Sequence, residues 1–182
     1  MTTSKSRGKL TDPSPWIERF AAEVRSHGSV LDLACGGGRH GRLFLERGCT
    51  VVFLDRNISG IGDIADNGLA EIIEADLETD NEWPLSGRLF DAVNVTNYLW
   101  RPIMPKIIAA VAPGGYLLYE TFARGNETFD RPRNPEFLLR SGELLEFVRG
   151  QLEILSYGQL YRDAPYPRIV QRIAARRPHG SS

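Results

Sequence analysis

The sequence predicts an α/β fold, in which a doubly wound and mostly parallel sheet of seven strands ends in an antiparallel hairpin. Apolar, strand-like runs alternate with segments of helical periodicity along most of the chain, as in parallel strands joined by crossover helices. A glycine-rich turn follows the first of these runs. The last two runs alternate polar and apolar residues and are separated by a short proline-containing loop, which indicates a hairpin.

The length and composition indicate a single domain. The chain has 182 residues, of which 42% are hydrophobic, and this is enough to bury a substantial core. We expect residues 1–11 to form a disordered tail and residues 12–178 to form the domain. The formal net charge of −1 provides no basic field that would attract nucleic acid, so a nucleic-acid partner is disfavoured.

The sequence indicates neither membrane targeting nor a metal site. The polar N-terminus lacks the apolar segment of a signal peptide, and no apolar run approaches the roughly 20 residues of a membrane span. The two cysteines, Cys35 and Cys49, provide no disulfide framework, and the three histidines are scattered. We therefore expect a cytoplasmic protein with no membrane partner and no bound metal.

The first strand, turn and helix carry the clearest functional signal. Residues 29–34 form an apolar strand that contains an acid, and residues 39–47 form the helix that follows. Between them, Gly36 and Gly38 allow positive φ angles and a close approach of the backbone to a ligand. The first turn of the helix directs free N–H groups to the same point, so we expect a small molecule with anionic or hydrogen-bond-accepting groups there.

The other elements follow in order. An N-terminal helix is capped near Ser14 and ends at Gly28, and we expect its Trp16 to pack in the core or to cover a ligand. Two glycines weaken a helix over 57–67, which we expect to be short or irregular. The sequence predicts strands at 50–55, 70–75, 89–95, 116–122, 152–157 and 168–175, and helices at 102–112 and 141–148. The turn at 113–115 is expected to end the helix before it.

The strand at 50–55 ends on Asp55. A carboxylate at this position suits the two hydroxyls of a ribose, whichever nucleoside is bound. The turn before it also fits the dinucleotide fingerprint, with Gly36, Gly38 and Gly41 at the required spacing. However, Asp32 lies inside the first strand, where a strand that binds pyrophosphate is usually apolar.

The run from Val30 to Gly38 resembles motif I of the class I S-adenosylmethionine-dependent methyltransferases, with Ala34 in place of the first glycine. Asp76, between Ala75 and Leu77, is similar to the acid that receives the adenine amino group in that family. The segment at 90–93, the turn at 113–115 and the terminal hairpin are also similar to features of the family. The resemblance covers roughly residues 29–175 and is to small, single-domain bacterial enzymes, including those related to tellurite-resistance methyltransferases.

This resemblance implies a Rossmann-like fold, S-adenosylmethionine as the cofactor with S-adenosylhomocysteine as its product, and methyl transfer to a small molecule by in-line displacement. Arg39 is expected to meet the methionine carboxylate, and Val95 and Thr96 the methionine portion. The full set of expected cofactor-binding residues is Asp32, Ala34, Gly36, Gly38, Arg39, His40, Asp55, Arg56, Ala75, Asp76, Leu77, Val95 and Thr96.

The acceptor side carries less specific signals. Tyr98 and Glu120 emerge at the carboxyl ends of strands and are the candidate catalytic residues, although Tyr98 also suits packing under the next helix. The loop at 123–135 leaves the same end, and we interpret it as a lid or as a solvated charged loop. Its arginines, at 124, 131 and 133, would favour an anionic acceptor.

The sequence also bears on three other functions. A non-catalytic S-adenosylmethionine-binding module remains open because the acceptor side has no diagnostic residues. A NAD-dependent oxidoreductase would need hydride-transfer machinery, and the sequence has no Tyr-x-x-x-Lys pair or appended substrate domain. An enzyme that methylates base amino groups would need prolines at residues 94–98, where the sequence has none.

Overall fold

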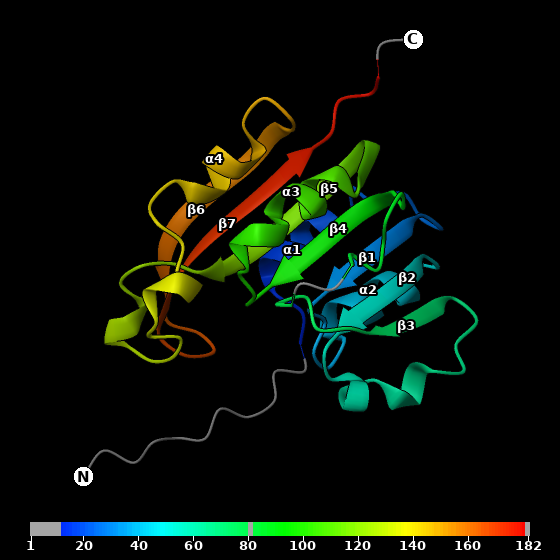
Figure 1. Cartoon of the computed structure of the whole chain (residues 1–182), viewed down its shortest axis with the longest axis horizontal. Helices are drawn as coiled ribbons and strands as arrows, with labels where there is room; N and C mark the ends of the chain where they lie inside the picture. The colour runs from blue at the N-terminus through cyan, green and yellow to red at the C-terminus, as the bar shows by residue number, and fades with distance from the viewer. Residues whose placement is uncertain (1–11, 80–81, 181–182) are drawn as a thin grey trace.

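The computed structural model describes residues 12–79 and 82–180 and confirms the predicted fold class. The strands are β1 (Ser29–Leu33), β2 (Thr50–Asp55), β3 (Ala70–Glu74), β4 (Phe90–Thr96), β5 (Val111–Phe122), β6 (Glu153–Arg162) and β7 (Arg168–Arg176). They form one sheet in the order β3-β2-β1-β4-β5-β7-β6 (Figure 1). β1 to β5 pair in parallel, whereas β7 is antiparallel to both β5 and β6. The tail predicted at 1–11 lies outside the described residues.

Helices cover both faces of the sheet, because alternate residues of the central strands point to opposite sides. The helices are α1 (Pro15–Ala21), α2 (Arg39–Glu46), α3 (Met104–Ala109) and α4 (Glu143–Val148). Leu31 of β1 belongs to a hydrophobic cluster that includes residues of α3 and α4. Val30, its neighbour, belongs to a second cluster with residues of α1 and α2. The sheet is therefore doubly wound, as the sequence predicts.

The connection between β2 and β3 is irregular, as expected from its glycines. It contains two short 3₁₀ turns, Ile58–Gly60 and Gly62–Ile64, in place of a crossover helix. Oδ1 of Asn57 accepts the N–H of Ser59 at 3.0 Å and starts the first turn. The chain thus crosses from β2 to β3 without a full helix on that side.

The segment after β4 differs from the prediction. A 3₁₀ turn at Arg101–Ile103 precedes α3, which ends at residue 109, and residues 113–115 lie inside β5 instead of ending a helix. The N–H of Gly114 donates to the carbonyl of Arg177 at 2.9 Å, and the Arg177 N–H donates to Gly115 at 2.8 Å. This exchange, together with a register shift between Phe90 and Ala92, holds the turn residues in the sheet.

The hairpin is longer than the sequence predicted. β6 continues to Arg162 and β7 begins at Arg168, so the loop between them lies at the end of the sheet where β5 finishes. Antiparallel pairing of Phe122 with Val170 fixes this position. Residues of the loop therefore reach the edge at which a parallel sheet binds its ligands.

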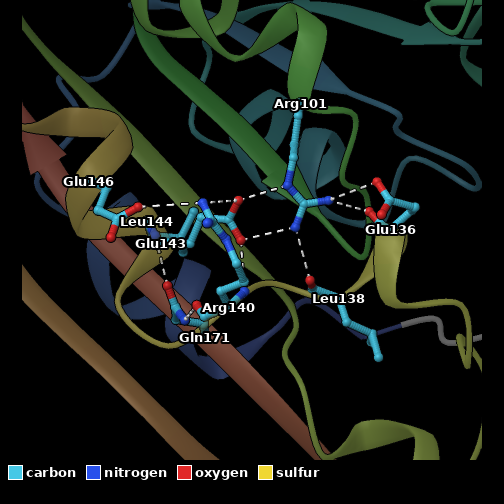
Figure 2. A network of polar contacts seen from close by, with 8 residues as sticks. All are labelled: Arg101, Glu136, Leu138, Arg140, Glu143, Leu144, Glu146 and Gln171. Atoms are coloured by element: carbon cyan, nitrogen blue, oxygen red, sulfur yellow. Dashed lines mark hydrogen bonds and ion pairs between the residues drawn. The ribbon is translucent and has the colours of Figure 1, made fainter.

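A buried carboxylate fastens α4 to the rest of the domain (Figure 2). Glu143 accepts two hydrogen bonds from Arg101, one from Nε at 2.7 Å and one from Nη2 at 3.0 Å. The N–H of Leu144 donates to Oε1 of Gln171 in β7 at 2.8 Å. Burial opposes the charge on Glu143, but its hydrogen bonds from Arg101 and Arg140 outweigh that cost and lower its pKa.

Helix α1 is anchored by Trp16, which packs in the core. This is one of the two positions expected for it, the other being a cover over a ligand. Only 4% of its surface is exposed, and the guanidinium of Arg172 lies 4.3 Å from its ring centroid. Within the ranges described, no helix has the length and apolarity needed to cross a membrane.

Candidate functional site

The turn between β1 and α2 has the backbone geometry that its glycines indicated. Gly36 and Gly38 have φ values of 55° and 69°, in the left-handed region that glycine enters without steric cost. Ala34 also has a positive φ, of 53°, although a residue with a Cβ is strained there. The alanine at a glycine position thus keeps the backbone shape of a glycine, and strain of this kind gathers at functional sites.

Helix α2 packs closely on β2 because residue 41 has no side chain. A Cβ at Gly41 would lie 2.1 Å from Cε1 of Phe53. The N–H of Gly41 donates to Oδ2 of Asp32 at 2.8 Å. This close contact places the first turn of α2 beside the end of β1 and forms one wall of the site.

Asp32 points into the interior and lines neither of the two cavities described below. It is 1% exposed, and Nδ2 of Asn94 donates to its Oδ1 at 2.6 Å. Burial raises the pKa of Asp32 to about 7, while hydrogen bonds from Asn94 and Gly41 act in the opposite direction. The geometry makes Asp32 a residue that positions the backbone of the turn.

The first cavity has a volume of about 120 Å³ and lies at the carboxyl ends of β1, β2 and β3. Asp55 accepts the N–H of Gly36 on Oδ2 at 2.8 Å and the N–H of Asn57 on Oδ1 at 2.9 Å. These bonds tie its carboxylate to the glycine turn. The lining residues are Ala34, Asp55, Arg56, Ala75, Asp76, Leu77, Glu78 and Tyr98.

Tyr98 lines this cavity, and its hydroxyl is not satisfied by the described part of the protein. It is buried and has no hydrogen-bond partner among the described residues. Burial raises the pKa of Tyr98, and the charges of Glu78 and Asp76 add to that effect. A buried hydroxyl without a partner is costly, so a ligand that offers it a hydrogen bond would be favoured here.

His40 connects the turn to α1 instead of facing a ligand. Its Nε2 accepts the N–H of Ser14 at 3.0 Å, so the ring proton is on Nδ1 and donates to Oγ1 of Thr96 at 3.1 Å. Burial and the nearby Arg39 lower the pKa of His40 to about 3. His40 is therefore neutral and already has a partner for each ring nitrogen, which excludes it as a general base in this arrangement.

The second cavity is larger, about 320 Å³, and lies beside the first. Adjacent residues separate the two, since Asn97 lines the second cavity and Tyr98 the first. Glu120 of β5 is 4% exposed and accepts the hydroxyl of Ser14 on Oε1 at 2.8 Å and Nη1 of Arg162 on Oε2 at 3.3 Å. The lining residues are Asp12, Pro13, Ser14, Pro15, Arg39, Asn97, Glu120, Arg162, Ala164, Pro165, Tyr166 and Arg168.

The structure places some of the predicted site residues at each cavity and others at neither. Asp55, at the end of β2, and Asp76, just after β3, meet at the first cavity, as their strand positions indicate. Tyr98 and Glu120, the two candidate catalytic residues, are separated, because Tyr98 lies with Asp55 and Asp76. Arg39 lines the second cavity, and its Nη1 donates to the carbonyl of Asp12 at 2.7 Å. The remaining predicted residues, Asp32, Gly36, Gly38, His40, Val95 and Thr96, line neither cavity.

Sequence reasoning missed the residues that the hairpin contributes. Arg162, Tyr166 and Arg168 line the second cavity, whereas the arginines of the 123–135 loop line neither cavity. A signal was available, because a strand antiparallel to β5 must begin where β5 ends. The loop before β7 is therefore at the ligand end of the sheet, and the arginines that flank it, Arg162 and Arg168, could have been proposed from topology alone. Among the residues in the described ranges, no group of three or more histidine, cysteine, aspartate or glutamate side chains is placed to hold a metal ion.

Comparison with known sequences identifies one family. The family described as "Methyltransferase domain" matches residues 7–174. No curated protein sequence matches the chain.

Solved structures with the same fold are numerous. TehB from Haemophilus influenzae superimposes with a TM-score of 0.72 at 20% identity, over 88% of this chain and 61% of that one. The N-methyltransferase NodS from Bradyrhizobium japonicum gives 0.68 at 15% identity, over 90% and 93%. The 1,6-didemethyltoxoflavin-N1-methyltransferase from Burkholderia thailandensis, solved with its substrate and S-adenosylhomocysteine, gives 0.64 at 18% identity, over 90% and 79%. At these identities the likeness concerns the fold, and the chain spans less than two thirds of TehB.

Proposed function

This chain belongs to the methyltransferase domain family, and we propose that it is an enzyme that transfers the methyl group of S-adenosylmethionine to a small acceptor. The arginines that line the second cavity favour an anionic acceptor. The first cavity would hold the nucleoside of the cofactor, and the second would hold the acceptor. A cytoplasmic location is part of this proposal, supported by two buried cysteines that are both free thiols.

The charge around the first cavity favours S-adenosylmethionine over a dinucleotide as the cofactor. Three carboxylates, those of Asp55, Asp76 and Glu78, line it together with the single guanidinium of Arg56. This net negative charge attracts the cationic sulfonium cofactor and repels the pyrophosphate of a dinucleotide. Asp55 by itself does not separate the two, because both cofactors have a ribose that its carboxylate would suit. In the sequence, Asp32 and the resemblance at Asp76 already favour S-adenosylmethionine.

The polar groups of the first cavity fit an adenosine. The carboxylates of Asp55 and Asp76 accept hydrogen bonds from ribose hydroxyls and from an exocyclic amine, as the family resemblance implies for these two positions. The unpartnered Tyr98 hydroxyl supplies a donor for a ring nitrogen or an ether oxygen. Ala75 and Leu77 flank Asp76 and provide apolar contacts for the base.

When bound, S-adenosylmethionine supplies a methyl group that is already strongly electrophilic. The protein is then required mainly to hold the acceptor in line with that group and to exclude water. Glu120 is oriented by Ser14 and Arg162 at the second cavity, and it would contact the acceptor and orient it. A general base is needed only for an acceptor that must lose a proton.

The test is calorimetric titration of the purified protein with S-adenosylhomocysteine and, in parallel, with NAD. We expect S-adenosylhomocysteine to bind and NAD to show no binding. Asp55→Asn and Asp76→Ala should each weaken the binding of S-adenosylhomocysteine by at least tenfold, since each removes a charged hydrogen-bond acceptor. Asp66→Ala serves as the matched control, because Asp66 is exposed and lines neither cavity.

Two outcomes would contradict the proposal. Binding of NAD alone would return the glycine turn to the dinucleotide-binding class. Binding of S-adenosylhomocysteine without transfer of a labelled methyl group to any member of a broad panel of small anions would favour the non-catalytic binding module. Thermal unfolding of each variant separates a lost contact from a lost fold.

A further inference from the structure

The second cavity contains a buried arginine whose charge no acid neutralises. Arg168 is 7% exposed, and within the described part of the chain no carboxylate lies within ion-pair distance of its guanidinium. Glu120, the nearby acid, pairs instead with Arg162 at 3.3 Å. A buried cation without a counter-ion is costly, so a ligand with the opposite charge would be favoured at this point.

The local backbone holds this guanidinium in one orientation. Nη1 of Arg168 donates to the carbonyls of Ala164 at 2.8 Å and Tyr166 at 3.0 Å, and the guanidinium lies 4.9 Å from the centroid of the Tyr166 ring. All hydrogen bonds of this side chain within the described residues leave from Nη1. Nε and Nη2 therefore form an unused pair of parallel donors, the arrangement that matches the two oxygens of a carboxylate.

The total charge of the cavity selects the class of anion. Arg39, Arg162 and Arg168 contribute three positive charges, and Asp12 and Glu120 contribute two negative ones, which leaves a formal excess of one positive charge. Burial, and then Arg162, lower the pKa of Arg168, which reflects the cost of holding this cation. A monoanion balances the excess, whereas a phosphate dianion would bring a second negative charge close to Glu120.

We infer that Arg168 anchors the acceptor by a bidentate contact to a carboxylate, and that the acceptor is a small monocarboxylic acid. This inference rests on the proposed function, since it treats the second cavity as the acceptor site. Prolines at positions 13, 15 and 165 supply apolar walls, and the cavity of about 320 Å³ is at the lower end of the range for small-molecule pockets, about 300–1,000 Å³.

The experiment uses benzoate as the carboxylate probe and benzamide as its neutral counterpart of nearly the same shape. Each is titrated into the full chain, with and without saturating S-adenosylhomocysteine, and binding is followed by NMR chemical shifts. We expect benzoate to bind and benzamide to bind at least tenfold more weakly. Arg168→Gln should weaken benzoate by roughly tenfold or more, and Arg168→Lys, which keeps the charge but not the fork, by a smaller factor.

Controls distinguish this inference from its alternatives. Arg149→Gln removes an exposed arginine that lines neither cavity and should leave benzoate binding unchanged. The affinity for S-adenosylhomocysteine should change by less than twofold in both Arg168 variants. This measurement therefore distinguishes an error in the cofactor assignment from an error in the assignment of the acceptor site. A melting temperature is measured for each variant, and Arg168→Lys remains informative if Arg168→Gln does not fold.

The results that overturn the inference are specific. Equal binding of benzoate and benzamide would show that the cavity does not select charge. Unchanged benzoate binding in Arg168→Gln, or its loss in Arg124→Gln, would place the anion elsewhere. If inorganic phosphate displaces benzoate and binds more tightly, the cavity selects another class of anion. If benzoate does not bind, either with or without S-adenosylhomocysteine, the carboxylate site is excluded.

Discussion

The backbone N–H of Ser14 donates to Nε2 of His40 at 3.0 Å. This contact joins the start of α1 to the start of α2, and the hydroxyl of Ser14 extends it to Glu120 at 2.8 Å. The glycine turn and the second cavity are thereby connected through buried hydrogen bonds. Since the N–H of Ser14 occupies Nε2, the neutral form of His40 is required for the arrangement to persist.

This requirement predicts how the stability of the protein changes at acidic pH. Burial and Arg39 lower the pKa of His40 from 6.5 to about 3, so between these values the unfolded chain binds a proton that the folded chain does not. The contribution of His40 to stability is complete above pH 6.5 and is lost as the pH falls. From pH 7 to pH 5 the loss is about 2 kcal/mol.

Asp32 has the opposite effect on stability as the pH falls. Burial raises its pKa from 3.8 to about 7, so the folded chain binds the proton first and gains stability as the pH falls from 7 towards 3.8. From pH 7 to pH 5 this gain is also about 2 kcal/mol, and the two contributions nearly cancel in the wild type. We expect Asp32→Asn to lose about 2 kcal/mol relative to wild type over this interval, and His40→Gln to gain a similar amount.

Urea unfolding at pH 7 and pH 5 measures both effects as differences from the wild type. Asn at position 32 retains an acceptor for the Gly41 N–H. Its NH₂ group replaces the oxygen that accepts Nδ2 of Asn94, and a flip of the Asn94 amide would present the unpartnered Oδ1 of Asn94 to it. A pH dependence identical to that of the wild type in both variants would show that neither group has a shifted pKa.

Replacement of Ala34 by glycine should stabilise the protein. The φ of 53° at Ala34 costs a residue with a Cβ about 1–2 kcal/mol, and glycine would relieve this strain. Glycine also loses more chain entropy on folding, which offsets about 0.5–1 kcal/mol of the relief. We expect a net gain of up to about 1.5 kcal/mol in the free energy of unfolding and an unchanged affinity for S-adenosylhomocysteine.

Denaturant unfolding of Ala34→Gly is compared with that of Gly150→Ala. Gly150 has a φ of 71° and open space around the position of a Cβ, so an alanine there introduces the same strain without a clash. It should lose about 1 kcal/mol. A loss of stability in Ala34→Gly would mean that packing of the Ala34 methyl group outweighs its backbone strain.

Removal of the Tyr98 hydroxyl should weaken the cofactor and spare the fold. We expect Tyr98→Phe to raise the dissociation constant of S-adenosylhomocysteine by roughly three- to tenfold, because a neutral hydrogen bond is worth about 0.5–1.5 kcal/mol. The free energy of unfolding should stay the same or rise slightly, since the hydroxyl is buried without a partner. The carbonyl of Tyr98, which accepts the Tyr119 hydroxyl at 2.8 Å, is retained.

Calorimetry and thermal unfolding check this prediction, with Tyr161→Phe as the control. Tyr161 is 52% exposed, its hydroxyl donates to Asp163, and neither residue lines a cavity. An unchanged affinity in Tyr98→Phe would show that the ligand leaves this hydroxyl unpartnered.

Two bidentate ion pairs in different environments should differ in their effect on stability. Glu143 is buried and paired with Arg101, whereas Glu71 and Arg88 pair on the surface with 51% and 39% of their side chains exposed. We expect Glu143→Gln to cost about 2–3 kcal/mol, because it removes a buried charge that accepts hydrogen bonds from Arg101 and Arg140 and replaces one acceptor oxygen with an amide donor. Glu71→Gln should cost less than about 1 kcal/mol. Denaturant midpoints measure both, and equal losses would contradict this ranking.

Much of the fold could be predicted from the sequence because its signals are local. Apolar runs, glycines with positive φ and a polar alternation near the end each act within a few residues. The acids at the ends of β2 and β3 were found for the same reason, since the end of a parallel strand is visible in the sequence. The length of α3 was not, because the turn at 113–115 is drawn into β5 by pairing with Arg177.

Local patterns of the sequence thus determined where the strands lie along the chain, the shape of the glycine turn and the end of the sheet at which ligands bind. The tertiary structure alone decided that Tyr98 faces the acids of the first cavity and that Arg168 joins Glu120 in the second. It also decided the opposite pKa shifts of Asp32 and His40. The physical reason is that burial and long-range hydrogen bonds depend on which distant segments pack together, and charge on a side chain responds to that packing.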